Sequence, residues 1–408
     1  MKSDRPIITL LGSNSGNNAG DAAILASILD VVSKSLTGAE FLVPTTNPSF
    51  INQNYSRFYN VKAINVMPWT ASIRLLGIPT INCMRKSDAA LVCDGIIFDK
   101  KLFNPAFNFL ITLFFLIPFA KIFNCKLVCY STGIGPFKSA IGRFMARTFI
   151  NSCDLVMMRE RDSQKLCDEI GVTKEVILTG DAAFLNKVSD DTRLEEIARA
   201  ERINLQNPLF GINVTSYIDQ WLKPEERVGS KEQYLSTLAL SVNKAKTKIQ
   251  GGFVPVIFST HPMDEEFAMR LAREVSGRVV SNKKYQSHDL MAVMRRCSLF
   301  MGMRFHSLVL ASAVESPIIG LVYAPKVRSY MRFLESEDVS LELNKLTEEK
   351  LAGIIIHAWE NRAEIQQRQK AHVDKLKEGA QNAANLLCDR FFSPKMSIAQ
   401  TEPSSVRQ

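Results

Sequence analysis

The sequence lacks the patterns that mark nucleic-acid binding. It has no long block of lysine and arginine, no stripe of alternating aromatic and basic residues, and no zinc-finger spacing of cysteine and histidine. Nucleic acid is therefore not the expected partner, although the 408 residues carry a formal net charge of +9. A positive charge of this size suits phosphorylated ligands or an anionic membrane surface.

The sequence also shows no secretory leader and no disulfide framework. Met1–Pro6 carries charges and leads into a short apolar run, which is too brief for the hydrophobic region of a signal peptide. The eight cysteines are scattered, and the pair Cys125 and Cys129 has no partner pair at metal-site spacing. We therefore expect a cytoplasmic protein with reduced, buried thiols.

One uncharged stretch, Leu102–Ala120, approaches the length of a membrane span. Asn104, Pro105, Asn108 and Pro118 interrupt it, so we predict a helix on the N-terminal domain rather than a span. Two placements fit this helix. It is either buried against a sheet, or partly exposed so that the protein lies peripherally at the inner face of the membrane.

Short apolar runs alternate with helix-like stretches, which is typical of parallel sheets covered on both faces. The alternation starts again after a charged connector, and the chain is too long for one core. We predict an α/β fold of two parallel-sheet, Rossmann-like domains that face a cleft. The predicted parts are an N-terminal α/β domain, a C-terminal α/β domain, C-terminal helices and a disordered tail, at residues 1–190, 205–345, 346–392 and 393–408.

Basic side chains follow several of the predicted strands. Ligands of open parallel sheets bind outside the carboxyl ends of the strands, where loops and helix N-termini gather. A lone surface cation is usually solvated, but a set at equivalent positions indicates an anion site. We expect Ser307 to cap a helix over Leu308–Val314 beside this site. The strand-end residues are Arg159, His261, Arg304, His306 and Lys326.

The first predicted strand, Ile7–Leu11, leads into the loop GSNSGNNAGD, which is rich in glycine and asparagine. Such a loop brings backbone N–H groups close to an anion, so Asn17, Gly20 and Asp21 are candidate substrate contacts. The loop lacks the lysine and serine or threonine of a P-loop and the glycine spacing of a dinucleotide fingerprint. Asp21 fits either a helix cap or a catalytic carboxylate.

Six segments together resemble the polysaccharide pyruvyl transferase family. The resemblance extends from about Ile7 to about Phe392. Ser131, Glu160 and Ala182 depart from the residues usual in the family, and Arg161 would replace Arg159 if the register slipped. The segments are Asn17–Leu25, Ser131–Phe137 with Gly135, Arg159–Val172, Thr179–Phe184 with Asp181, Gly302–Ala311 and Tyr323–Val327.

This resemblance implies a GT-B-like arrangement and phosphoenolpyruvate as the donor. Arg159, Arg304, His306 and Lys326 would then lie near the donor, since Arg and Lys bind phosphate and carboxylate well. His306 would act as the general acid when a sugar hydroxyl attacks C2. The acceptor would be a sugar or a lipid-linked oligosaccharide, and Gly135, Asp181 and His261 are further candidate contacts.

Neither a metal nor a cofactor is expected. The candidate site contains cations, whereas a divalent metal requires clustered carboxylates. Asp94 and Asp99 form the one close acidic pair in a loop of the first half, and we interpret them as polar loop residues.

Two other functions fit the same features. Facing α/β domains also serve glycosyltransferases that use a nucleotide sugar. A family relative that only binds, without catalysis, is the other alternative, because of the departures from the family pattern.

Overall fold

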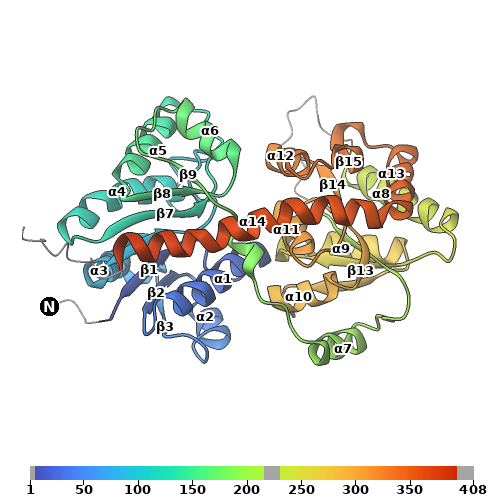
Figure 1. Cartoon of the computed structure of the whole chain (residues 1–408), viewed down its shortest axis with the longest axis horizontal. Coiled ribbons are helices and arrows are strands. Elements are labelled where there is room, and N and C mark those ends of the chain that lie inside the picture. The colour runs from blue at the N-terminus through green and yellow to red at the C-terminus, as the bar shows by residue number, and fades with distance from the viewer. Residues whose placement is uncertain (1–4, 216–229, 393–408) are drawn as a thin grey trace, which may run out of the picture.

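A computed structural model describes residues 5–215 and 230–392 and shows two parallel sheets side by side (Figure 1). The predicted tail at residues 393–408 lies outside the described residues. The predicted fold class, two parallel-sheet α/β halves, is confirmed.

The N-terminal sheet has seven parallel strands in the order β3-β2-β1-β6-β7-β8-β9. Two helices, α1 (Ala19–Ser35) and α2 (Pro48–Asn54), cover one face. The other face is covered by α3 (Ile78–Lys86), α4 (Phe109–Ile122), α5 (Ala140–Ser152) and α6 (Arg161–Glu169). The strands are β1 (Ile7–Leu11), β2 (Glu40–Thr45), β3 (Val61–Asn65), β6 (Ala89–Val92), β7 (Lys126–Thr132), β8 (Leu155–Met158) and β9 (Ile177–Leu178).

The C-terminal sheet has six parallel strands in the order β12-β11-β10-β13-β14-β15. They are β10 (Leu209–Asn213), β11 (Val254–Ser259), β12 (Arg278–Ser281), β13 (Cys297–Gly302), β14 (Ile318–Val322) and β15 (Ser340–Glu342). The helices of this half are α8 (Lys231–Lys248), α9 (Glu265–Glu274), α10 (Ser287–Met294), α11 (Phe305–Ala313), α12 (Pro325–Phe333) and α13 (Glu348–Glu360). Helix α7 (Asp191–Ala200) lies in the connector.

Both sheets have the doubly wound order, in which the chain direction across the sheet reverses once. The reversal lies between β1 and β6 in the first sheet and between β10 and β13 in the second. Loops that leave these strands diverge to opposite faces, and ligands bind in the crevice between them. The loop at Gly12–Asn18 and the loop after β13 therefore occupy binding positions.

The predictions for two helices, α4 and α11, were wrong in detail. The residues before Phe109 form turns, so α4 is shorter than the predicted helix over Leu102–Ala120, and the side chain of Asn108 caps it. Helix α11 begins at Phe305, and Ser307 bonds the Arg304 carbonyl instead of capping the helix. All eight cysteines are buried and unpaired, as the sequence predicts.

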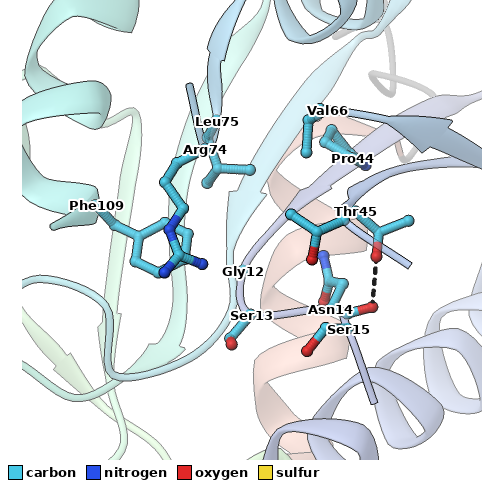
Figure 2. A pocket seen from close by; sticks show the side chains of 11 residues that line it. Gly12, Ser13, Asn14, Ser15, Pro44, Thr45, Val66, Arg74, Leu75 and Phe109 are labelled. Atoms are coloured by element: carbon cyan, nitrogen blue, oxygen red, sulfur yellow. Dashed lines mark hydrogen bonds between the residues drawn. The ribbon is translucent and has the colours of Figure 1, made fainter. Parts of the chain in front are cut away.

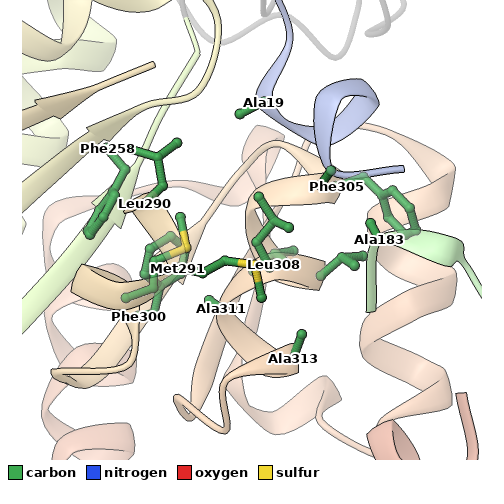
Figure 3. Close-up of a cluster of buried hydrophobic side chains, with 14 of the residues drawn as sticks. Ala19, Ala183, Phe258, Leu290, Met291, Phe300, Phe305, Leu308, Ala311 and Ala313 are labelled. Carbon is green, nitrogen blue, oxygen red and sulfur yellow. The ribbon is translucent and has the colours of Figure 1, made fainter. Parts of the chain in front are cut away.

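A continuous core joins the two halves. Helix α1 of the first half packs against α10 and α11 of the second, and the short helix η2 (Ala182–Leu185) packs against α1 and α11. Ala19 and Ala183 accordingly lie near Phe305 and Leu308 in one apolar cluster (Figure 3). A second core cluster fills the space between the N-terminal sheet and α3 to α6.

The last helix, α14 (Arg362–Phe391), has 30 residues and extends along both halves (Figure 1). It packs against α1, η2 and β7 of the first half and against α11 and α13 of the second. Among the described residues, no helix combines the length and apolarity needed to cross a membrane.

The backbones of α14 and the loop after β9 touch at Gly180. A Cβ added there would lie 2.0 Å from the Leu376 carbonyl oxygen, a backbone atom that cannot rotate away. Because overpacking costs about 1–3 kcal/mol, we expect Gly180→Ala to lower the free energy of unfolding by about that amount in urea titrations. Gly353→Ala in α13 is the control, since nothing lies within 4 Å of that Cβ. Equal midpoints for the two variants would contradict this packing.

Candidate functional site

Arg159 is the central cation of the site and directly follows β8. It is 7% exposed, and its Nη1 lies 2.9 Å from Oδ2 of Asp181. Its guanidinium carbon lies 5.2 Å from the ring centroid of Phe305, which belongs to the second half. Burial disfavours the charged guanidinium, but Asp181 and Glu160 outweigh it and raise the pKa of Arg159. The side chain is therefore a fixed positive charge.

Asp181 holds this cation in place. Asp181 is buried. It caps η2 by accepting a hydrogen bond of 2.9 Å from the Ala183 N–H. Burial alone would raise its pKa, but Arg159 and His306 lower it to about 2. Asp181 therefore carries a negative charge at every physiological pH.

His306 reaches this pair from the C-terminal half, in the first turn of α11. Its Nε2 lies 3.3 Å from Oδ2 of Asp181 and 3.5 Å from Nη1 of Arg159. Gly20 makes the approach possible, because a Cβ at that position would lie 2.3 Å from Cγ of His306. The imidazole thus sits against the N-terminal turn of α1, where any side chain would displace it.

Lys326 adds a second cation from the first turn of α12. Its Nζ lies 5.8 Å from the centroid of the Phe305 ring, which Arg159 also contacts. Desolvation around the ammonium, together with Arg159, lowers its pKa to about 8. The residue nevertheless retains an exposed surface, so a ligand can reach it from solvent.

Two carboxylates, Asp21 and Asp94, complete the group. Asp21 lies in the first turn of α1, which Asn18 caps, so Asp21 is not the helix cap. Burial raises the pKa of Asp21 against the opposing effect of His306, Lys326 and Arg159. It is half-exposed and therefore accessible.

Asp94 follows β6 at the reversal point of the N-terminal sheet. Its Oδ2 accepts a hydrogen bond of 2.7 Å from the Ser13 N–H, and its Oδ1 has no partner among the described residues. Burial and the nearby Asp21 raise its pKa to about 8. The interpretation of Asp94 as a polar loop residue was therefore incomplete, since it is a buried member of the site. Its position at a strand end was the available signal.

Arg304 and His261 form a neighbouring group rather than part of the Arg159 cluster. The Arg304 Nε donates to the buried Asp264, and its backbone N–H donates to Oδ1 of Asn213. Nδ1 of His261 accepts a hydrogen bond of 3.1 Å from the Met263 N–H. Burial and then Arg304 lower the pKa of His261.

Asn17 and Gly135 lie at the edge of the site. The Asn17 carbonyl accepts a hydrogen bond of 2.8 Å from Nδ2 of Asn282, which links the two halves. Gly135 faces Leu166 of α6. Gly133 instead faces Arg159, because a Cβ there would lie 2.8 Å from Nη2. Sequence reasoning did not single out Gly133, and the candidate substrate contact at Gly135 stays a prediction.

A small pocket in the N-terminal half is lined in part by the Gly12–Ser15 loop (Figure 2). Its volume is about 20 Å³, and Thr45, Arg74 and Phe109 line it together with the loop. Arg74 stacks on Phe109 with its guanidinium carbon 5.0 Å from the ring centroid, and burial lowers its pKa. The pocket admits one small polar group beside Ser13, whose backbone holds Asp94.

A metal centre is not found within residues 5–215 and 230–392, where no three His, Cys, Asp or Glu side chains are grouped to hold an ion. Asp99 points away from Asp94 and accepts hydrogen bonds from the N–H groups of Lys138 and Ser139 at the start of α5. The predicted independence from metals stays a prediction.

Two doubly wound halves with a site at their junction define the GT-B-like class. UDP-GlcNAc 2-epimerase from Neisseria meningitidis has this fold, with a TM-score of 0.61, 14% identity, and coverage of 94% of this chain and 99% of that chain. A glycosyltransferase from Rickettsia africae gives a TM-score of 0.56 at 10% identity, over 96% and 100% of the two chains. These similarities show the fold alone.

The sequence profile of the polysaccharide pyruvyl transferases matches residues 18–325. The chain belongs to this family, which confirms the resemblance found in its motifs. It is also 22% identical over 406 residues to the amylovoran biosynthesis protein AmsJ of Erwinia amylovora, covering 88% of this chain and 94% of that protein.

The raised pKa of Asp94 predicts a specific pH dependence of stability. The folded state binds the Asp94 proton more tightly than the unfolded state, whose carboxyl has a pKa near 3.8. Stability from this group is therefore present at low pH and is lost as the pH rises toward about 8. We expect Asp94→Asn, which stays neutral, to gain stability relative to the parent as the pH rises from 5 to 8. The measurement is the melting temperature of both proteins at each pH. A difference between them that stays constant from pH 5 to 8 would contradict a buried, protonated Asp94.

Proposed function

We propose that this chain transfers a pyruvyl group from phosphoenolpyruvate to sugar hydroxyls of a polysaccharide or its lipid-linked precursor. The observation that carries the proposal is the convergence of Arg159, His306 and Lys326 at the junction of the halves. Family membership supports a transferase that acts on polysaccharide.

The cluster suits a ligand with two anionic groups. Arg159 uses Nη1 for Asp181, whereas its buried Nε has no hydrogen-bond partner among the residues described. A Cβ at Gly133 would lie 2.8 Å from Nη2, so only the missing side chain leaves space beside this end of the guanidinium, while Oε2 of Glu160 lies 3.6 Å from Nε. In the proposal, a phosphate or carboxylate oxygen of the donor accepts a charge-assisted hydrogen bond from Nη2. The exposed Lys326 supplies the second charge, and the N-terminal turns of α11 and α12 favour anions.

In the proposed reaction, a sugar hydroxyl oxygen bonds to C2 of phosphoenolpyruvate while C3 accepts a proton from His306. Asp181 orients the imidazole, since its Oδ2 lies 3.3 Å from Nε2 of His306. Asp21 takes the hydroxyl proton while the buried Asp94 keeps its own proton, so the proton count of this step balances within the site. Phosphate then leaves from C2, and a second hydroxyl closing on C2 would give a cyclic ketal.

The acceptor would approach from the side of the Gly12–Ser15 loop, where Ser13 connects the pocket of Figure 2 to Asp94. The relative named for amylovoran biosynthesis supports an extracellular polysaccharide, or its lipid-linked repeat unit, as the acceptor. No cofactor enters this scheme, since phosphoenolpyruvate is the donor substrate.

The proposal is tested by incubating the purified protein with phosphoenolpyruvate and a pyruvate-free surface polysaccharide. We expect release of one phosphate for each pyruvyl group found on the glycan by mass spectrometry. Thermal stabilisation by a nucleotide sugar but not by phosphoenolpyruvate would favour a glycosyltransferase instead. Binding of phosphoenolpyruvate without phosphate release on any acceptor would indicate a non-catalytic relative.

Substitution of Lys326 should weaken donor binding. Loss of a charge-assisted contact costs about 1.5–3 kcal/mol, so Lys326→Ala should raise the donor dissociation constant roughly tenfold to hundredfold. Arg332→Ala is the matched control, because Arg332 lies in the same helix and pairs with Glu337 at the surface. Equal donor affinities in the two variants would exclude Lys326 from the donor site.

Substitution of His306 should affect turnover rather than binding. If His306 supplies the proton to C3, His306→Ala should lower kcat roughly hundredfold or more with a smaller change in donor affinity. Single-turnover kinetics and a separate binding titration measure the two effects. If His306→Ala instead loses donor affinity while its turnover is unchanged, His306 acts in binding alone.

A further inference from the structure

Exposed apolar side chains gather at one side of the N-terminal half. Of the thirteen exposed large apolar residues that the structure describes, eight lie in the segments from the short helix η1 (Pro68–Thr70) to α5. Helix α4 packs against α3, α5 and the strand β5 (Leu76–Gly77), which pairs with β4 (Ser72–Ile73) in a small hairpin. These segments are therefore neighbours, and Figure 1 shows α4 beside α5. The eight are Trp69, Ile73, Ile78, Phe103, Phe115, Ile122, Ile141 and Phe144.

Part of this surface, on α4 and α5, forms one continuous patch. The ring centroids of Phe114 and Phe115 are 5.7 Å apart, and those of Phe114 and Phe144 are 6.2 Å apart across the two helices. Phe115 and Phe144 are 49% and 51% exposed. We name Phe114, Phe115, Ile141 and Phe144 the α4-α5 patch. The other face of α4 is buried, with Leu110, Leu113 and Leu116 in the core.

The chain segment that carries the patch has charges of one sign only. Between Asp99 and Asp154 the sequence contains seven lysines and arginines and no aspartate or glutamate. Arg143 and Arg147 lie on α5 itself, and the guanidinium carbon of Arg147 lies 5.9 Å from the ring centroid of Phe144. Lys121 is exposed at the end of α4. Large exposed apolar residues on a segment whose charges are all positive match an anionic lipid surface, with rings inserted and cations at the headgroups.

We infer that the α4-α5 patch docks the protein on a membrane surface that contains anionic lipid. This docking is independent of the proposed catalytic function. Of the two placements that the sequence left open for this helix, the inference selects the partly exposed one. One face of α4 packs on the sheet, and the opposite face contacts lipid.

The test is sedimentation or flotation of the full chain with vesicles of phosphatidylcholine and phosphatidylglycerol in equal parts, at low salt. We expect binding that decreases as salt is added and that is weak on vesicles of phosphatidylcholine alone. Phe115→Asp with Phe144→Asp should lower the partition coefficient roughly tenfold or more. Each of Arg143→Ala and Arg147→Ala should lower it roughly fivefold.

Phe58→Asp is the matched control, since Phe58 is 76% exposed but follows α2 at the opposite edge of the sheet. It should bind vesicles as the parent does. Equal losses in Phe58→Asp and the double variant would overturn the inference, as would a parent chain that fails to bind anionic vesicles. Self-association through the patch, seen as a dimer that the double variant abolishes without any vesicle binding by the parent, would assign the patch to a second copy of the chain and overturn it as well. Thermal melting confirms that the variants remain folded.

Discussion

The structure depends on the burial of one guanidinium, that of Arg159. A buried charge is tolerated only when partners replace its lost hydration. Asp181 supplies the opposite charge, and His306 from the second half completes the contact. Residues around the charge must leave room for these partners, which explains glycine at positions 20 and 133. The close packing of the two halves at their junction and the residue types in the site therefore both follow from the burial of Arg159.

The convergence of Arg159, His306 and Lys326 could be predicted from sequence because each follows a parallel strand, and the carboxyl ends of such strands share one edge. The same rule grouped Arg304 and His261 with these residues, whereas the structure places them in a neighbouring group; their contacts with substrate stay predictions. It could not reveal that Asp264, from a different loop, binds Arg304. It missed Asp94 because we applied the rule to cations only, although Asp94 also follows a strand.

The fold was predictable where the strands lie inside a sheet and are mostly apolar, as in β1, β8 and β14. Three edge strands, β3, β12 and β15, were not identified. Their sequences VKAIN, RVVS and SLE are short and contain charged residues, because one side of an edge strand faces solvent. The start of α4 was also misplaced, since apolar composition alone does not separate a helix from the buried turns that precede it.

Helix α4 connects the α4-α5 patch to the pocket beside Ser13. Phe109, the first residue of α4, lines the pocket beside Ser13, and Phe115 follows six residues later on the exposed face. At 1.5 Å per residue, this is a separation of about 9 Å along the helix. A lipid-linked acceptor held at the membrane surface would thus need only a short reach to bring its sugar to the site.

The continuous helix α14 limits how freely this protein can be recombined with its relatives. Domains in many enzymes are exchanged as units because few contacts cross the linker. Here the C-terminal segment of the chain returns to pack on α1 and β7 of the first half, with backbone contact at Gly180. A chimaera that takes its N-terminal half from a relative must therefore also take the turns of α14 that pack on that half, because side chains from two different sequences would not fit together along the helix.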